Sequence, residues 1–217
     1  MLLGQLMQEY RKAGEIDFEA VNLVMDPGYS PANRQQIENN AFRLGLSCTV
    51  FESSIFDIAD RQVHNPCFMC ARMRRGTLYS KAQSLGCNKI ALGHHMDDVI
   101  ETTFLAMFYG AQLQAMPPSL RSLNYPGMSL IRPLYYIREK DIIEWADRHG
   151  LSFLQCACRL TEKDSHTDSK RLEAKRILDR LEREYPGTSR TVFESIRHLQ
   201  KESLPGGRAN PYDEREK

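Results

Sequence analysis

The sequence predicts an α/β protein built around a doubly wound parallel sheet, and three observations predict this class. Short β-rich runs alternate with stretches of helical periodicity over residues 1–132. This alternation is typical of βα units that feed a parallel sheet. A chain of 217 residues, 41% of them hydrophobic and 26% charged, has ordinary globular composition. That length supports one substantial core with a small appendage.

The first half of the chain contains most of the predicted strands. An opening helix has apolar side chains at helical spacing, namely Leu2, Leu3, Leu6, Met7 and Tyr10, and an apolar, β-branched strand follows at 18–26. After the turn DPGYSP come a polar helix at about 31–44 and the strand 47–53. The cysteine segment then leads into a helix through about residue 85, and the next strand is NKIALG at 88–93.

The second half begins with a helix at 97–109 that has one apolar face. A Pro-containing loop and the short strand SLIRPL follow, and then a helix from REKDIIEWADRHG that Gly150 closes. From about residue 160 the composition turns highly charged, and Leu172, Ile177, Leu178 and Leu181 indicate an amphipathic helix. We therefore expect an α/β domain over 1–160, a charged helical extension over 161–203 and a disordered tail over 204–217.

Composition excludes several classes of protein. Six cysteines are too sparse for a disulfide-built miniprotein, and no N-terminal segment has the pattern of a signal peptide. These features favour a reducing, cytoplasmic setting. The longest apolar runs fall far short of the roughly 20 residues that span a bilayer, so no membrane partner is expected. A net charge of +1 excludes no nucleic-acid binder, because basic residues can gather in one patch.

Cys67 and Cys70 form a CxxC pair that has four interpretations. It could be a redox pair, half of a zinc site, part of an iron–sulfur ligand set or two structural thiols. A zinc ribbon would place its second pair within about 15 to 20 residues, whereas Cys156 and Cys158 lie much further along. Two thiol groups, each at the end of a predicted element, favour one shared inorganic centre. We interpret the remaining cysteines, Cys48 and Cys87, as structural.

The segment GHHMDD runs from a predicted strand into a helix, where open α/β sheets bind ligands. Asp97 and Asp98 could hold Mg²⁺ beside nucleotide phosphates, and the two histidines could orient substrate. A structural alternative is a capping box that pairs Asp98 with Glu101. The basic residues Arg72, Arg74, Arg75 and Lys81 directly follow the CxxC thiols. They form either a solvated helix face or a phosphate-binding surface, and their position favours the second.

Four motifs together carry a resemblance to a known family: CFMCARMRRGTLY, KIALGHHMDDVIETTFLAMFYG, MPPSL followed by LIRPLYYIREKDI, and the late CAC. With them the chain resembles the tRNA 2-thiocytidine synthetase family of the PP-loop ATPases over about residues 17–165. The resemblance implies an adenine nucleotide alpha hydrolase-like fold that binds ATP and Mg²⁺. It also implies that a tRNA anticodon-loop cytidine is activated by adenylation and that sulfur then replaces its oxygen. A [4Fe-4S] cluster, held by three cysteines, would carry the sulfur on an open iron.

The resemblance also assigns roles to individual residues. Cys67 and Cys70 fall on the CxxC ligands and Cys156 on the third ligand. Cys158 stays an alternative third ligand, because the late motif here is CxC where the family usually has CxxC. Nucleotide and catalytic roles fall on Gly93, His94, His95, Asp97, Asp98 and Arg132, and tRNA binding on Arg72, Arg74 and Arg75. The implied partners are tRNA and a sulfur donor such as a cysteine desulfurase, and a homodimer is possible.

One departure from the family pattern concerns the phosphate loop. PP-loop enzymes carry SGGxDS after their first strand, and these 217 residues contain no such motif. That loop cradles pyrophosphate with backbone amides at a helix N-terminus. We therefore expect Met1 to be an internal methionine of a longer protein. The fold would then lack its first, central strand and leave the two neighbouring strands unpaired along their edges.

Three rival functions remain open at this point. A non-catalytic tRNA-binding or iron–sulfur relic of the family is supported by the absent phosphate loop. A ligase similar to tRNA lysidine synthetase shares the nucleotide fold but, as a rule, lacks this cysteine pattern. A thiol–disulfide oxidoreductase would use the CxxC pair alone.

Overall fold

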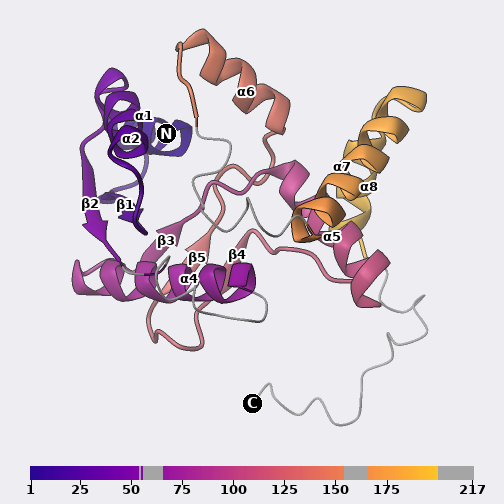
Figure 1. Cartoon of the computed structure of the whole chain (residues 1–217), viewed down its shortest axis with the longest axis horizontal. Helices are drawn as coiled ribbons and strands as arrows, with labels where there is room; N and C mark the ends of the chain where they lie inside the picture. The colour runs from indigo at the N-terminus through magenta and orange to yellow at the C-terminus, as the bar shows by residue number, and fades with distance from the viewer. Residues whose placement is uncertain (54, 56–65, 154–165, 200–217) are drawn as a thin grey trace.

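The structure is a computed structural model that describes residues 1–53, 55, 66–153 and 166–199, with side chains described except at 66–71 and 166–169. Its elements follow one another along the chain as Figure 1 shows. The helices and strands are α1 (Leu2–Ala13), β1 (Asn22–Asp26), α2 (Pro31–Arg43), β2 (Cys48–Glu52), α4 (Pro66–Ser84), β3 (Lys89–Ala91), α5 (Met96–Gly110), β4 (Ser119–Arg121), β5 (Ser129–Ile131), α6 (Glu139–Arg148), α7 (His166–Glu184) and α8 (Thr188–Arg197).

The strands form two sheets. β1 and β2 pair in parallel, in a register that runs from Asn22 opposite Cys48 to Asp26 opposite Glu52. The second sheet has the order β3-β5-β4, with β3 parallel and β4 antiparallel to β5. Within the described ranges no strand pairs with the second edge of β1 or of β3. That a longer protein would supply a further strand between β1 and β3 stays a prediction.

Helix α4 joins the two sheets through its apolar side chains. Met73 and Leu78 pack on the first sheet, in a cluster around Met25 of β1. Tyr79 and Ala82 pack on the second sheet, in a cluster that also takes in Leu23 of β1 together with Ile90 and Leu130. The open edges of β1 and β3 therefore border the same apolar layer.

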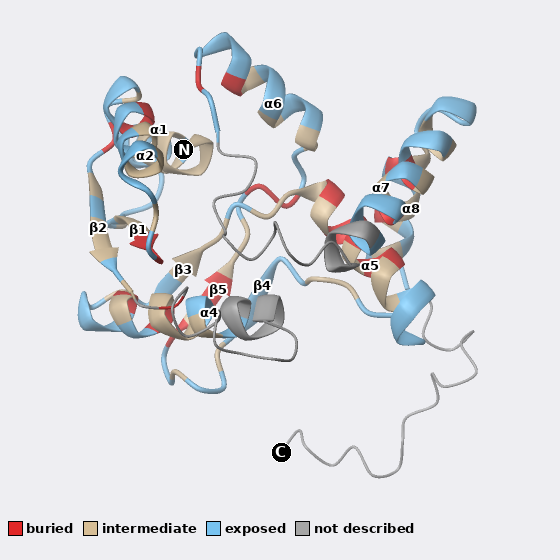
Figure 2. Ribbon diagram, in the orientation of Figure 1, coloured by how far each residue is buried: buried red, intermediate tan, exposed pale blue. Residues whose placement is uncertain are grey.

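The largest apolar cluster lies between α5 and the two C-terminal helices. Val99 and Ile100 of α5 and Phe193 of α8 are fully buried there, and Ala174 and Leu178 of α7 join them. Figure 2 shows buried positions on α5, α7 and α8 where these helices meet, whereas α6 is exposed over most of its length. The helical extension thus packs directly on the helix that begins at GHHMDD.

Most of the predicted elements are confirmed within a few residues, with three differences. The strand expected at 18–26 begins only at Asn22, after a segment that carries charged Glu19. The strand expected for SLIRPL ends at Ile131, because Pro133 has no N–H for a ladder. The edge strand β4 and helix α8 were not expected, although Val192, Phe193 and Ile196 have helical spacing.

Helix α8 is capped by a carboxylate from α7. Its own N-cap residue, Gly187, has no side chain, and Glu182 accepts hydrogen bonds from the backbone N–H groups of Gly187 (3.0 Å) and Ser189 (2.7 Å) and from the Ser189 hydroxyl (2.8 Å). These bonds lower the pKa of Glu182 to about 2. The carboxylate therefore stabilises the folded state above its ordinary pKa, and this stabilisation disappears as the pH falls through about 2.

Replacing Glu182 by alanine is expected to lower the free energy of unfolding by about 1 to 2 kcal/mol at pH 7, because three donors at the start of α8 lose their acceptor. Urea unfolding followed by circular dichroism at pH 7 and pH 3 measures this difference, which should shrink at the lower pH. Glu184→Ala, at an exposed position two residues on, is the matched control. Equal losses for the two variants would contradict the capping role.

Among the described residues, no helix combines the length and apolar character that a bilayer crossing requires.

Candidate functional site

The segment that follows β3 turns sharply into helix α5, and a capping box fixes this turn. His95 is the N-cap residue, and its ring accepts a hydrogen bond from the backbone N–H of Asp98 at 3.4 Å. In return, the Asp98 carboxylate accepts from the backbone N–H of His95 at 3.0 Å. The capping box considered from the sequence, between Asp98 and Glu101, was therefore wrong. His95 and Asp98 both hold the backbone at this corner.

Asp97 docks helix α6 onto the start of α5. Its buried carboxylate, 7% exposed, accepts from Arg138 Nε at 3.1 and 3.2 Å, and Nη2 of the same guanidinium lies 3.0 Å away. It also accepts from the backbone N–H of Glu139 at 2.7 Å. Arg138 is the N-cap residue of α6 and makes no side-chain cap of its own. Asp97 therefore caps α6 through a backbone N–H that lies 42 residues further along the chain.

Arg171 of helix α7 contacts the start of α5, as Arg138 does. Arg171 Nη1 lies 3.3 Å from a carboxylate oxygen of Asp98 and 3.3 Å from one of Glu101. Glu101 is 6% exposed, and burial raises its pKa to about 7 despite the opposing effect of Arg171. Asp97 and Asp98 are thus each paired with a guanidinium group, and these contacts lend no support to Mg²⁺ at either carboxylate. Their metal role stays a prediction.

A hollow of about 250 Å³ lies between α4 and the sheet that contains β3 and β5. Its lining combines an apolar floor with positive charge, and it consists of Arg74, Arg75, Leu78, Tyr79, Ile90, Leu92, His94 and Leu130. No carboxylate is among these residues. We call this site the cationic hollow.

Two buried nitrogen atoms beside the cationic hollow have no hydrogen-bond partner in the described structure, namely His94 Nδ1 and Arg132 Nε. Burial lowers the pKa of Arg132, and the nearby charge of Arg75 lowers it further. The pKa of His94 is lowered by burial as well, against the attraction of Asp98. The positive charges of Arg75 and Arg132 repel each other, and the buried nitrogens of His94 and Arg132 lack hydrogen-bond partners in the described structure. Both effects cost folding free energy, and a bound anion would offset that cost.

The structure therefore brings together three residues that the sequence singled out, namely Arg74, Arg75 and His94. A fourth, Arg132, lies close enough to Arg75 and His94 for their charges to affect one another. Arg132 also donates from Nη1 to the carbonyl oxygen of Pro117, which fixes its guanidinium group. Gly93 lies at the turn after β3 and is exposed, with open space where a Cβ would stand. Arg72 is exposed on α4 and lines neither the cationic hollow nor the second hollow on α4, which is described below.

The structure places the cysteines only in part. Cys67 and Cys70 lie in the first turns of α4, and their side chains belong to the part that is not described. Cys156 and Cys158 lie outside the described residues. Among the described side chains, no group of three or more His, Cys, Asp or Glu could hold a metal ion. Cys48 and Cys87 are half-buried free thiols, and Cys87 packs against the apolar cluster around Tyr79.

Sequence reasoning missed the residues from other helices that contact the carboxylates at the start of α5. Arg138, Arg171 and Glu139 contact Asp97 or Asp98, and Lys175 forms an ion pair with Glu139. Only one signal pointed to any of them: the charged composition of the extension that contains Arg171 and Lys175. No local sequence pattern indicates which charged side chains of this extension contact α5.

The sequence matches a known protein family and named relatives. Residues 1–162 match the family described as the PP-loop domain. A protein of Pelobacter propionicus named tRNA-cytidine(32) 2-sulfurtransferase is 34% identical over 209 residues, which cover 93% of this chain and 76% of that protein. A protein of the same name from Cellvibrio japonicus is 37% identical over 203 residues, covering 92% of this chain and 65% of its own length.

A further relative and one solved structure complete the comparison. A Shewanella halifaxensis protein with the same name is 41% identical over 159 residues, which cover 71% of this chain and 49% of that protein. The chain thus spans less than two thirds of the Cellvibrio and Shewanella proteins. The U34-tRNA thiolase NcsA from Methanococcus maripaludis, solved with its [4Fe-4S] cluster, has a TM-score of 0.70 at 20% identity and covers 91% of this chain and 66% of its own. This likeness shows that the two share a fold.

Proposed function

Because the chain belongs to the tRNA-cytidine(32) 2-sulfurtransferase family of PP-loop proteins, we propose that it takes part in 2-thiolation of a tRNA anticodon-loop cytidine, at position 32 as the names of its relatives state. In this reaction ATP activates the base by adenylation, and sulfur then replaces the base oxygen, which leaves with AMP. The observation that carries the proposal is the cationic hollow, which Arg74, Arg75 and His94 line. His94 and the nearby Arg132 each have a buried nitrogen without a partner in the described structure.

The cationic hollow suits phosphate better than any other group in this reaction. Guanidinium groups bind phosphate oxygens through paired N–H donors, and His94 adds a further nitrogen from the turn before α5. The neighbouring carboxylate of Asp98 is already neutralised by Arg171, so it does not repel an incoming anion. We assign the phosphates of ATP to this hollow, with Arg132 as the inner contact and Arg74 and Arg75 at the opening toward tRNA.

The start of α4 suits an iron–sulfur cluster. Cys67 and Cys70 stand three positions apart on a helix, which places both on one face. The positive end of the helix dipole at Pro66 favours the negative charge of thiolate ligands. When bound, a [4Fe-4S] cluster with three protein ligands offers one open iron for sulfur. Cys156 or Cys158 would be the third ligand, and alanine variants of each would distinguish them by which one abolishes the absorption band near 400 nm.

Partners and location follow from the reaction. The substrate is tRNA, and the sulfur comes from a donor such as a cysteine desulfurase. We place the protein in the cytoplasm, where both are found, and a homodimer stays a prediction.

A second function is favoured by one observation. These 217 residues contain no SGGxDS motif, so the usual backbone cradle for pyrophosphate is not among them. A tRNA-binding or iron–sulfur module without ATP chemistry would need none. Titration of the protein with ATP and Mg²⁺ by calorimetry separates the two: saturable binding that the Arg132→Ala variant weakens supports the enzyme, and no binding supports the module.

A complementation experiment tests thiolation in cells. The gene is expressed in a bacterium whose own tRNA-cytidine(32) 2-sulfurtransferase has been deleted, and tRNA nucleosides are separated and identified by mass spectrometry. The proposal predicts that 2-thiocytidine returns with the wild-type gene and stays absent with the Cys67→Ala gene. If 2-thiocytidine stays absent although the protein accumulates, the proposed function is contradicted.

A further inference from the structure

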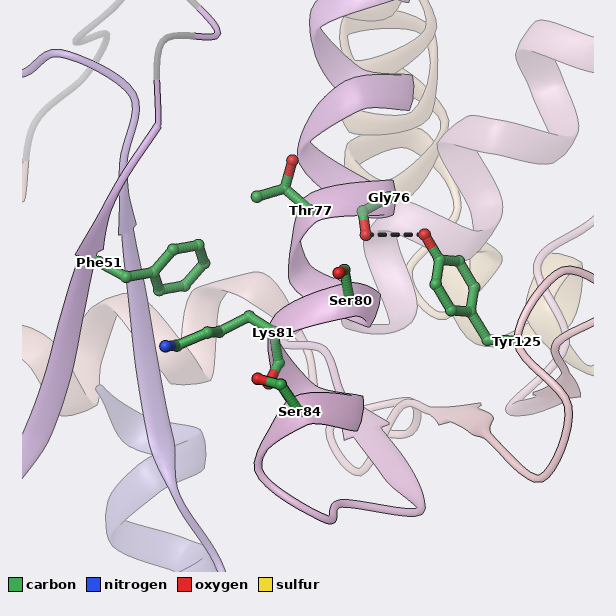
Figure 3. A pocket seen from close by; sticks show the side chains of 7 residues that line it. All are labelled: Phe51, Gly76, Thr77, Ser80, Lys81, Ser84 and Tyr125. Carbon is green, nitrogen blue, oxygen red and sulfur yellow. Dashed lines mark hydrogen bonds between the residues drawn. The ribbon is translucent and has the colours of Figure 1, made fainter.

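An open hollow of about 430 Å³ also lies on α4, and it shares none of its lining residues with the cationic hollow. Figure 3 shows its lining: Phe51 of β2 faces Lys81 across the opening, and Tyr125 from the segment between β4 and β5 closes the other side. Between them stand Gly76, Thr77, Ser80 and Ser84, all from α4. The volume falls within the range of pockets that bind small ligands. We call it the α4 pocket.

The polar side chains of the α4 pocket suit an anion. Lys81 has no carboxylate partner in the described chain, and none of the seven lining residues is acidic. The hydroxyl groups of Thr77 and Ser80 have no hydrogen-bond partner among the described residues, whereas Ser84 donates to the carbonyl oxygen of Lys81 at 2.8 Å. One cation and two available hydroxyls are groups that bind phosphate oxygens in nucleic-acid complexes.

The aromatic side chains of the pocket suit a base. The Phe51 ring lies 5.9 Å from the Lys81 ammonium, so the cation stands beside an aromatic surface. Tyr125 is held rigidly, because its ring stacks on Tyr79 at 4.9 Å and its hydroxyl donates to the carbonyl oxygen of Gly76 at 3.0 Å. Aromatic surfaces beside a cation are the means by which proteins hold single-stranded nucleic acid.

The position of the pocket on α4 connects it with the proposed site. Arg74, Thr77 and Lys81 follow one another at helical spacing, so they share a face of α4. Arg74 also lines the cationic hollow. From Arg74 to Lys81 the helix rises about 10 Å, a length that an RNA strand spans with a few nucleotides. The helix therefore offers a basic path from one hollow to the other.

From these observations we infer that the α4 pocket is a binding site for one unpaired nucleotide of the tRNA, with its phosphate on Lys81, Thr77 and Ser80 and its base against Phe51. This inference rests on the proposed function for the identity of the RNA. It adds a contact outside the reacting centre, so the pocket contributes to tRNA affinity and not to the chemical step.

Two variants test the inference through tRNA affinity, measured by filter binding over a range of salt concentrations. Lys81→Ala should weaken binding about fivefold and reduce the slope of log K against log salt by about one, because one phosphate contact is lost. Phe51→Leu should weaken binding about five- to tenfold and leave the slope unchanged, because stacking releases no counterions. Lys140→Ala, at an exposed position of α6, removes the same charge elsewhere and should leave affinity within twofold.

The outcomes separate this inference from the proposed function. If the wild-type protein binds tRNA and Lys81→Ala matches Lys140→Ala, the inference fails while the proposed function stands. If the wild-type protein binds no tRNA, both fail. Competition with AMP distinguishes the source of the nucleotide: AMP that fills the pocket should weaken tRNA binding by no more than about the fivefold loss expected for Lys81→Ala, because the other tRNA contacts stay in place. If AMP binds wild-type protein but not Lys81→Ala, and the variant keeps full tRNA affinity, the pocket takes a free nucleotide and the inference is overturned.

Discussion

Replacement of Asp97 by asparagine is expected to lower the free energy of unfolding by about 2 to 4 kcal/mol. The amide can still accept the hydrogen bond from the backbone N–H of Glu139, but it leaves the guanidinium of Arg138 without its counter-charge. Breaking a buried ion pair on one side costs about 3 to 5 kcal/mol, and the 22% exposure of the Arg138 side chain reduces that figure. Equilibrium unfolding in urea at pH 7 measures the difference.

Asp147→Asn is the matched control for this variant. Asp147 lies on the exposed surface of α6, so the same chemical change there should alter stability by less than about 0.5 kcal/mol. The Arg138→Met variant in combination with Asp97→Asn should recover part of the loss, because it removes the unpaired charge. Equal stability of Asp97→Asn and Asp147→Asn would show that Asp97 does not dock α6 onto α5.

Replacement of Cys67 by alanine is expected to abolish the iron–sulfur cluster and to reduce tRNA thiolation by more than about 100-fold. Loss of an outer-shell partner of a metal ligand already costs about 10- to 100-fold, and Cys67 is proposed as a ligand itself. Anaerobic purification followed by absorption near 400 nm and by iron and sulfide determination measures the cluster. Thiolated nucleoside in tRNA, quantified by mass spectrometry, measures activity.

Cys48→Ala serves as the control for the cysteine variant. Cys48 is a half-buried thiol in β2, and burial raises its pKa, which favours the neutral thiol over a metal-binding thiolate. The control should keep its cluster and its activity. A Cys67→Ala protein that retains brown colour and full iron content would remove Cys67 from the ligand set.

The sequence was sufficient for most of the strands and helices, though not for β4 and α8, because most elements follow from the pattern of apolar residues within a short stretch of chain. The apolar runs that became β1, β2 and β3 and the periodic face of α5 lie within short windows. The corner at His95 was harder, since the sequence pattern also fits a capping box between Asp98 and Glu101. Only the geometry showed that His95 is the N-cap residue and that Asp98 is its partner.

Contacts across long stretches of chain could not be predicted in the same way. Asp97 meets Arg138 at a separation of 41 residues, and Asp98 meets Arg171 at a separation of 73. The choice of partner depends on how α6 and α7 pack on α5, which no local pattern specifies. The α4 pocket is a similar case, because Phe51 of β2 and Tyr125, from the segment between β4 and β5, line it together with Lys81 although they are far apart in the sequence.

The most direct measurement is thiolation of tRNA by the purified protein. The chain, with its cluster reconstituted anaerobically, is incubated with tRNA from cells that lack 2-thiocytidine, together with ATP, Mg²⁺ and sulfide. We expect 2-thiocytidine at position 32, detected by mass spectrometry of nuclease fragments, to appear only when ATP is present. Unmodified cytidine at position 32, from protein that carries an intact cluster and binds tRNA, would contradict the proposed function.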